Sequence, residues 1–177
     1  GTTCAERNRV IGNYFGVRAD GATPIDSDAG GSVTVTGVTS DLGGDCDPNE
    51  IGGTAAGEGN GISGSLAAGN TAKAATISGG RGTLVQGNMI GATADGTARI
   101  AGTKETGVHV TSGVNALIGG TVPAASNTIA GNEADSMFAF GVHVAGGGSA
   151  GTLIQGNRIG TNAAGTAGTS DFEHGVY

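Results

Sequence analysis

Near the end of the chain the sequence reads Gln155-Gly156-Asn157-Arg158-Ile159-Gly160, and this short stretch decides the fold. Its core, Asn-x-(Ile/Val) followed within two residues by Gly, recurs five times along the chain, beginning at Asn8, Asn60, Asn88, Asn127 and Asn157. A motif that returns at a nearly regular interval is typical of stacked-repeat proteins, in which each unit buries its apolar face against the next.

Two further apolar segments belong to each complete repeat. One alternates apolar and polar residues and begins at Val33, Ala75, Val108, Val142 and Val176. The other ends in Gly and occupies residues 50–52, 84–87, 117–119 and 153–156. With the Asn motif, whose apolar residues are Val10, Ile62, Ile90, Ile129 and Ile159, each repeat is predicted to form three short strands bounded by turn residues.

The repeats favour parallel stacking of these strands over helices or hairpins. No window sustains a helical apolar period, and 38 glycines in 177 residues would each cost a helix interior about 1 kcal/mol relative to Ala. An antiparallel sandwich would not require equivalent strands to repeat in sequence. We therefore predict an all-β β-solenoid of about five coils, spaced about 4.8 Å apart.

The loops alternate between successive repeats. One repeat places a loop, residues 121–126, before its Asn, whereas the next runs directly into Asn157 and follows with a long loop, residues 161–173. The same alternation occurs in the two preceding repeats, so the larger repeat is two coils. We expect one continuous domain over residues 1–177 and, because the first and last repeats are incomplete, a segment of a longer solenoid.

Equivalent residues lie above one another in such a stack, so Asn8, Asn60, Asn88, Asn127 and Asn157 are predicted to form a ladder at one corner. Each amide can bond to the turn backbone of its own or the neighbouring coil. The alternative is that Asn is present only for its turn conformation. Val, Ile and Leu are expected inside, where a narrow interior leaves little room for aromatic rings.

The phrases Gly119-Gly120-Thr121…Asn127-Thr128-Ile129-Ala130-Gly131-Asn132 and Gly156-Asn157-Arg158-Ile159-Gly160-Thr161-Asn162 resemble the parallel β-helix repeats of large bacterial exported proteins, which are related in fold to the pectate lyases. The resemblance covers essentially the whole chain. It implies a right-handed parallel β-helix with an asparagine ladder. It implies little about activity, because such repeats occur in adhesins and surface proteins as well as in polysaccharide-cleaving enzymes.

The charge composition limits the classes of partner that the chain is expected to bind. Eight basic and fifteen acidic residues give a net charge of −7, which disfavours nucleic acid and anionic membranes. No apolar run approaches the length of a membrane span. We expect a secreted or cell-surface location, with neighbouring solenoid repeats or other copies stacked end to end as partners, and polysaccharide as a further candidate.

Two loop features are candidate stabilising or binding sites. Cys4 and Cys46 are the only cysteines, and an exported chain favours a disulfide between them over two free thiols. Asp45, Asp47 and Asn49 place oxygen ligands at every second residue, as calcium loops do. The simpler interpretation is a solvated acidic loop, so no cofactor is expected and calcium is the one alternative.

An outward column of Thr34, Thr76, His109, His143 and Tyr177 is predicted on one sheet. Stacked imidazoles could bind a transition metal or respond to pH, and the column could contact sugars. Surface residues inherited by duplication are the simpler account.

The acidic residues fall mainly in loops, and no pair two residues apart on a strand provides the carboxylates that polysaccharide hydrolysis requires. The sequence therefore predicts a non-catalytic structural or adhesive segment. The alternative is a carbohydrate-binding or polysaccharide-cleaving β-helix.

Overall fold

A computed structural model describes residues 7–25, 32–36, 48–63, 73–101, 106–131, 139–170 and 172–177. These residues form fifteen short strands and one 3-10 helix, η1 (Pro123–Ala125), and none of their helices is long and apolar enough to span a membrane. The strands belong to three sheets. The first sheet holds β1 (Arg9–Val10), β4 (Glu50–Gly52), β7 (Leu84–Gln86), β10 (Leu117–Gly119) and β13 (Leu153–Gln155). The second holds β2 (Tyr14–Phe15), β5 (Gly61–Ile62), β8 (Met89–Ile90), β11 (Thr128–Ile129) and β14 (Arg158–Ile159). The third holds β3 (Val33–Thr36), β6 (Lys73–Ser78), β9 (Thr106–Val110), β12 (Phe140–Val144) and β15 (His174–Val176).

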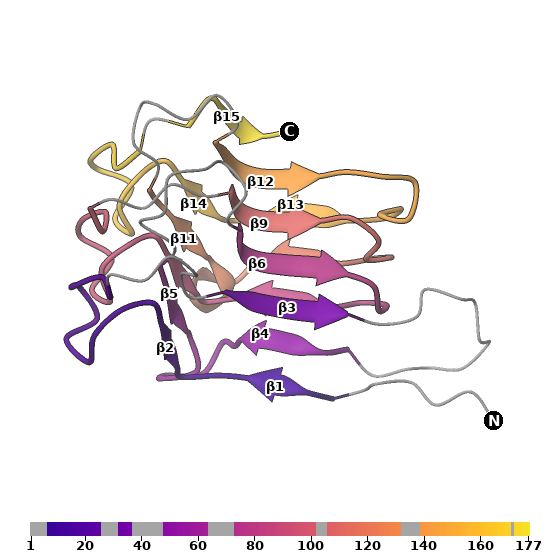
Figure 1. The fold of residues 1–177 in the computed structure, drawn as a ribbon, viewed down its shortest axis with the longest axis horizontal. Helices are drawn as coiled ribbons and strands as arrows, with labels where there is room; N and C mark the ends of the chain where they lie inside the picture. Colours follow the sequence, from indigo (N-terminus) through magenta and orange to yellow (C-terminus); the bar gives the residue numbers. More distant parts are fainter. Residues whose placement is uncertain are drawn as a thin grey trace.

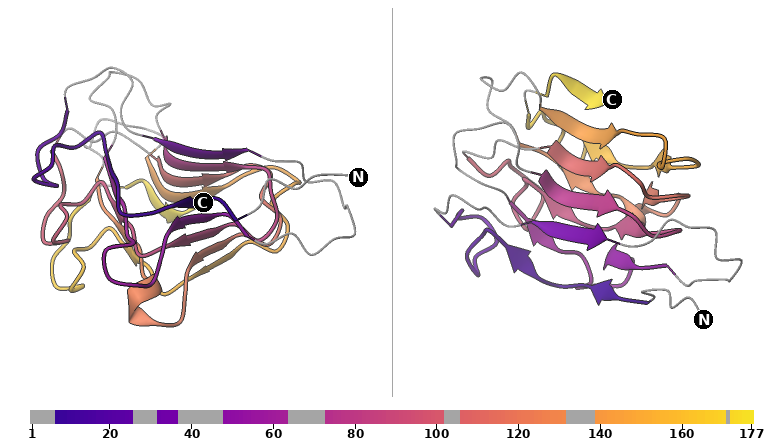
Figure 2. Two further views of the ribbon diagram at one scale, coloured as in Figure 1. Left: turned by 90° about the horizontal axis from the view of Figure 1, so that it is seen from below. Right: turned by 45° about the vertical axis from the view of Figure 1, so that its right-hand side comes forward.

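The chain visits the three sheets in turn and returns to the first after every third strand, so each coil contributes one strand to each sheet. All pairs between successive coils are parallel, and the coils stack along one axis (Figure 1). Viewed along that axis, the strands of each sheet overlie one another (Figure 2, left). This is the predicted right-handed parallel β-helix of five coils, with the handedness that parallel crossovers almost always adopt.

The interior consists of columns of equivalent apolar residues. Ile51, Val85 and Ile118 stack in the first sheet, and Ile62, Ile90 and Ile129 stack in the second. All six are almost completely buried, and burying one such side chain stabilises the fold by about 1.5–3 kcal/mol. The expectation that Leu also points inward is wrong for the first sheet. Its leucines, Leu84, Leu117 and Leu153, precede the inward residues by one position and therefore lie on the outer face.

The asparagine ladder is confirmed at the corner that precedes the second sheet. The backbone N–H and side-chain amide of Asn88 both donate to Asn127 Oδ1, at 3.0 and 2.9 Å. The same pair of bonds runs from Asn60 to Asn88 and from Asn127 to Asn157. Each of these amides also donates to a backbone carbonyl, as Asn88 does to Ile51 O. The ladder therefore satisfies polar groups of the turns in the three middle coils, where Asn60, Asn88 and Asn127 are buried.

The assignment of Asn8 to this ladder is wrong, because Asn13 occupies the place in the first coil. Asn13 donates its backbone N–H and side-chain amide to Asn60 Oδ1, at 3.0 and 3.2 Å. Asn8 instead donates to Asn49 Oδ1 at the corner that precedes the first sheet. Val10 correspondingly pairs with Ile51 of the first sheet, and Phe15 takes the inward position predicted for Val10. The two corners carry similar amide pairs, but only one continues through all five coils.

Two glycines permit close approach of coils in the third sheet. A Cβ on Gly141 would lie 2.4 Å from Ile159 Cγ2 and 2.5 Å from Gly175 O, and a Cβ on Gly107 would meet Gly141 O at 2.5 Å. Both glycines therefore face inward, although the inward Val108 and Val142 directly follow them. Two consecutive inward residues interrupt the alternation of the strand, and Phe140, which precedes the pair in β12, lies on the outer side against His143.

The predicted alternation of loops is also present. Long loops follow the second-sheet strands of the first, third and fifth coils, and each is closed by one antiparallel bridge: Val17 with Pro24, Ala92 with Arg99 and Thr161 with Gly168. The loop tips contact one another across the intervening coils, since Ala94 N donates to Gly21 O and Ala163 N to Gly96 O, both at 2.8 Å. The long loops thus form a continuous wall beside the second sheet.

An acidic or amide side chain organises each long loop. Asp95 accepts from the Thr93 hydroxyl, the Thr97 N–H and the Thr97 hydroxyl, and these bonds lower its pKa to about 2. Asp20 is held in the same way, chiefly by the Thr23 hydroxyl, and its pKa is also about 2. In the third loop Asn162 Oδ1 accepts from the backbone N–H groups of Thr166 and Ala167. The loop therefore requires an oxygen acceptor more than a charge.

Replacing Asn88 by Ala tests the ladder. The change removes the acceptor for Asn60 and the donor to Ile51 O, so we expect a loss of about 1–3 kcal/mol in the free energy of unfolding for each buried group left unpaired. Asn8→Ala is the matched control and should cost less, because Asn8 is exposed and belongs to an amide pair instead of the ladder. Urea denaturation followed by circular dichroism measures both. Equal losses would contradict the importance of the ladder.

Replacing Asp95 tests the loop. At neutral pH Asp95→Ala should lower the melting temperature more than Asp95→Asn does, because Asn162 serves the equivalent loop with an amide oxygen. The folded-state pKa of Asp95 lies below its ordinary 3.8, so its stabilising contribution is present above pH 3.8 and is lost as the pH falls towards 2. Calorimetry should therefore show a smaller acid-induced decrease in melting temperature for Asp95→Asn than for the unchanged chain. An equally large decrease would show that the Asp95 carboxylate does not contribute.

Candidate functional site

The outer face of the second sheet forms the floor of a groove that runs along the stack. Its outward residues are, from the first coil to the fifth, Tyr14, Gly61, Met89, Thr128 and Arg158. The long loops form one wall. The loops before the ladder asparagines of the second and fourth coils, residues 53–59 and 120–126, form the other, and Figure 2 (left) shows both sets of loops projecting beside the sheet.

Large and small floor residues alternate and divide the groove into two hollows. The first, of about 500 Å³, lies over Gly61 between Tyr14 and Met89 and is bordered by residues 53–57 and by Ala94. The second, of about 370 Å³, lies over Thr128 between Met89 and Arg158 and is bordered by residues 120–123 and by Ala163. The two hollows are therefore equivalent and lie two coils apart. Twice the usual strand spacing gives a separation of about 10 Å.

Two large floor residues, Tyr14 and Met89, lie close to glycines of the long loops. A Cβ on Gly21 would meet the Tyr14 ring at 3.2 Å, and a Cβ on Gly96 would meet Met89 Sδ at 3.4 Å. Both glycines have positive φ angles, of 64° and 67°, in the left-handed region that favours glycine. The repeat pattern alone did not predict this groove. The signal was available in the repeated phrase Ala94-Asp95-Gly96 and its counterpart Ala19-Asp20-Gly21, because the Gly of each phrase lies seven residues after a large outward residue, Met89 or Tyr14.

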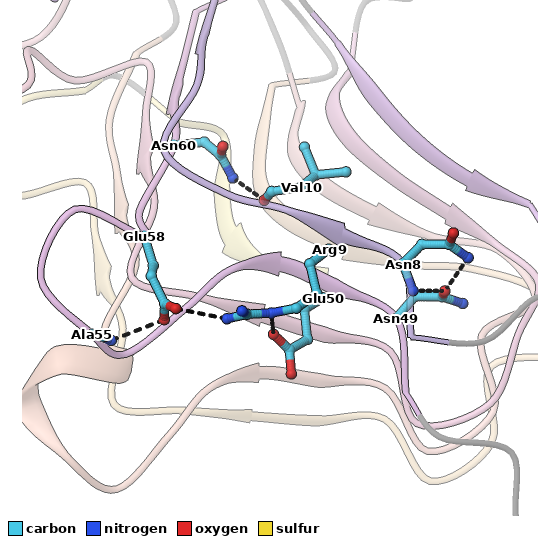
Figure 3. A network of polar contacts seen from close by, with 8 residues as sticks. All are labelled: Asn8, Arg9, Val10, Asn49, Glu50, Ala55, Glu58 and Asn60. Atoms are coloured by element: carbon cyan, nitrogen blue, oxygen red, sulfur yellow. Dashed lines mark hydrogen bonds and ion pairs between the residues drawn. The ribbon is translucent and has the colours of Figure 1, made fainter.

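The charged groups near the start of the first sheet form one network, shown in Figure 3. Arg9 bonds to Glu50 through Nε and to Glu58 through a terminal nitrogen at 2.7 Å. The Arg9 hydrogen bond is the largest cause of the lowered pKa of Glu58, and Glu58 also accepts from Ala55 N. This network ties the loop of residues 53–59 to the first coil, so both carboxylates have structural partners.

The predicted outward column lies on the third sheet in the expected register. Thr34 pairs with Thr76, Thr76 with His109 and His109 with His143, while Tyr177 N donates to Val142 O beside His143. The rings of His109 and His143 stack with centroids 4.8 Å apart and an interplanar angle of 26°. Phe140 and Tyr177 contact the His143 ring at 4.8 and 5.3 Å. The column thus ends in an aromatic cluster that the sequence pattern alone did not indicate.

The two stacked histidines favour the neutral state. Burial lowers the pKa of His109 to about 4, with further contributions from the positive charge of Lys73 and from His143. The pKa of His143 is also lowered, by burial and then by Lys73. His109 Nδ1 is enclosed and has no hydrogen-bond partner among the described residues.

Most of the remaining candidate residues lie in parts of the chain that the structure does not describe. Cys4, Cys46, Asp45 and Asp47 lie outside the described residues, so the disulfide and the calcium site stay predictions. Asn49 is buried and accepts from Asn8. Within the described part of the chain, no three His, Cys, Asp or Glu side chains are grouped as a metal site.

Comparisons with known protein families, with curated proteins and with solved structures found no match to this chain. The groove of the second sheet and the histidine column of the third sheet are therefore interpreted from their own geometry.

Proposed function

We propose that this chain is a non-catalytic structural or adhesive segment of a longer, exported β-helix protein at the cell surface or outside the cell, from the repeat family that its sequence resembles. Its stacked coils form a scaffold, and the groove of the second sheet is the surface through which it adheres. Among the described residues, the first and last strands of each sheet are paired on one side, and further repeats or other copies of the chain are the partners that fit such strand edges.

The main support for this proposal is that four carboxylates are held in hydrogen bonds or ion pairs of the fold. Glycoside hydrolysis requires two carboxyl groups facing one substrate, one of which must hold a proton. Asp20 and Asp95 accept hydrogen bonds within their own loops and have a pKa of about 2, which disfavours a role as proton donors. Glu50 and Glu58 are paired with Arg9. These four groups therefore support a structural role over a catalytic one.

The hydrogen bonding between coils further supports a scaffold. Three sheets, the ladder and the contacts between long-loop tips bind each part of the stack to its neighbours. A groove built on such a scaffold has a fixed shape. Preformed sites lose less conformational entropy when they bind, so even a shallow surface can adhere to a partner.

The alternative is a carbohydrate-binding or polysaccharide-cleaving β-helix, and the two equivalent hollows favour it. Their separation of about 10 Å suits a linear polymer with a repeating unit of that length that lies along the stack, such as an extended polysaccharide. Tyr14 is half exposed at one end of the groove, and an aromatic ring with a polar tip is suited to such a contact.

One set of measurements distinguishes the two. The chain is incubated with neutral and acidic polysaccharides, and binding is measured by affinity electrophoresis while cleavage is measured by the release of reducing ends. We expect no cleavage, and any binding should be weakened by Ala56→Trp, which places a large ring beside the first hollow from an exposed position. Ala150→Trp is the control, because Ala150 is exposed and does not line the groove. Cleavage that Ala56→Trp abolishes and Ala150→Trp preserves would overturn the non-catalytic proposal.

A further inference from the structure

Two histidines lie side by side on the outer face of the third sheet. His109 of β9 and His143 of β12 are register partners on adjacent parallel strands, and their ring centroids are 4.8 Å apart. Two imidazole nitrogens that bind one zinc ion lie about 2.0–2.1 Å from it. Because the two side chains leave adjacent strands at the same register position, binding of one shared ion requires the rings to turn from their stacked arrangement until one nitrogen of each faces it.

The nitrogens of the pair differ in accessibility. His109 Nδ1 is enclosed and unpartnered, which leaves Nε2 as the nitrogen that can meet a ligand. The surroundings also favour neutral imidazoles, the form that binds metal ions, so protons do not compete at neutral pH.

The neighbouring groups set the strength of such a site. Lys73 of β6 is close enough to lower the pKa of both histidines, and its positive charge opposes a bound cation. Phe140 packs against the His143 ring, and His174 contacts Phe140 and Tyr177 instead of the histidine pair. Metal on Nε2 would also fix the proton of His109 on Nδ1, where no acceptor is present. These features indicate moderate affinity.

We propose that His109 and His143 form a two-histidine site for a divalent transition-metal ion on the outer face of β9 and β12. Imidazole nitrogen suits Zn²⁺, Ni²⁺ and Cu²⁺ and does not suit Ca²⁺ or Mg²⁺, which prefer oxygen. Water completes the coordination, because the described residues offer no third ligand in the same group. This site is independent of the groove on the second sheet and of the proposed adhesive role.

The test is a titration of the chain with zinc chloride, after removal of any purification tag, followed by NMR of the histidine ring signals. We expect saturable, concerted shifts for His109 and His143 and little change for His174. His109→Ala and His143→Ala should each weaken the apparent dissociation constant by about tenfold or more. His174→Ala is the control and should bind zinc as the unchanged chain does.

Two further variants keep the test decisive. His143→Asn retains a polar side chain if His143→Ala fails to fold, and it should also weaken zinc binding. Lys73→Met removes the opposing charge and should tighten binding. The absence of saturable shifts at His109 and His143, or a loss of binding in His174→Ala equal to that in His143→Asn, would overturn the proposal.

Discussion

The hydrogen bonds between successive ladder asparagines hold the coils in register. Asn13, Asn60, Asn88, Asn127 and Asn157 each occupy one turn, and the first four donate both the backbone N–H and the side-chain amide to the next residue in the series. Asn60, Asn88 and Asn127 are buried, so water cannot replace the bonds of these three turns. A coil that shifted by one residue would lose them and would also move its inward side chains to the outer face.

The register in turn determines the interior. Because each Ile or Val lies above its counterpart, the core consists of columns of similar branched side chains, and the sheets approach closely enough that Gly107 and Gly141 leave no space for a Cβ. The same restriction acts on the outside of the third sheet. The inward glycine directly precedes an inward valine, so Phe140 faces outward, where it packs against His143 and Tyr177.

The outer surface is less constrained, and there the two-coil repeat becomes visible. Long loops on alternate coils bond to one another, and large floor residues beside them separate two similar hollows. The hydrogen bonds within these loops also lower the pKa values of Asp20 and Asp95. The scaffold thus supports two separate surfaces, a groove on the second sheet and a histidine-containing column on the third.

The sequence alone determined the parallel stack, the three strands in each coil and the outward histidine column, because these depend on a periodic pattern of residue types. It did not distinguish Asn8 from Asn13, since each is followed two residues later by a large apolar residue, Val10 or Phe15. The phrase Gly12-Asn13-Tyr14-Phe15-Gly16 matches Gly87-Asn88-Met89-Ile90-Gly91, but an aromatic residue replaces Ile. Only the tertiary structure decided which Asn joins the ladder, because that choice depends on pairing with Asn60 in the next coil. The groove and the ring contacts of His143 were likewise decided by packing between coils, which no single repeat contains.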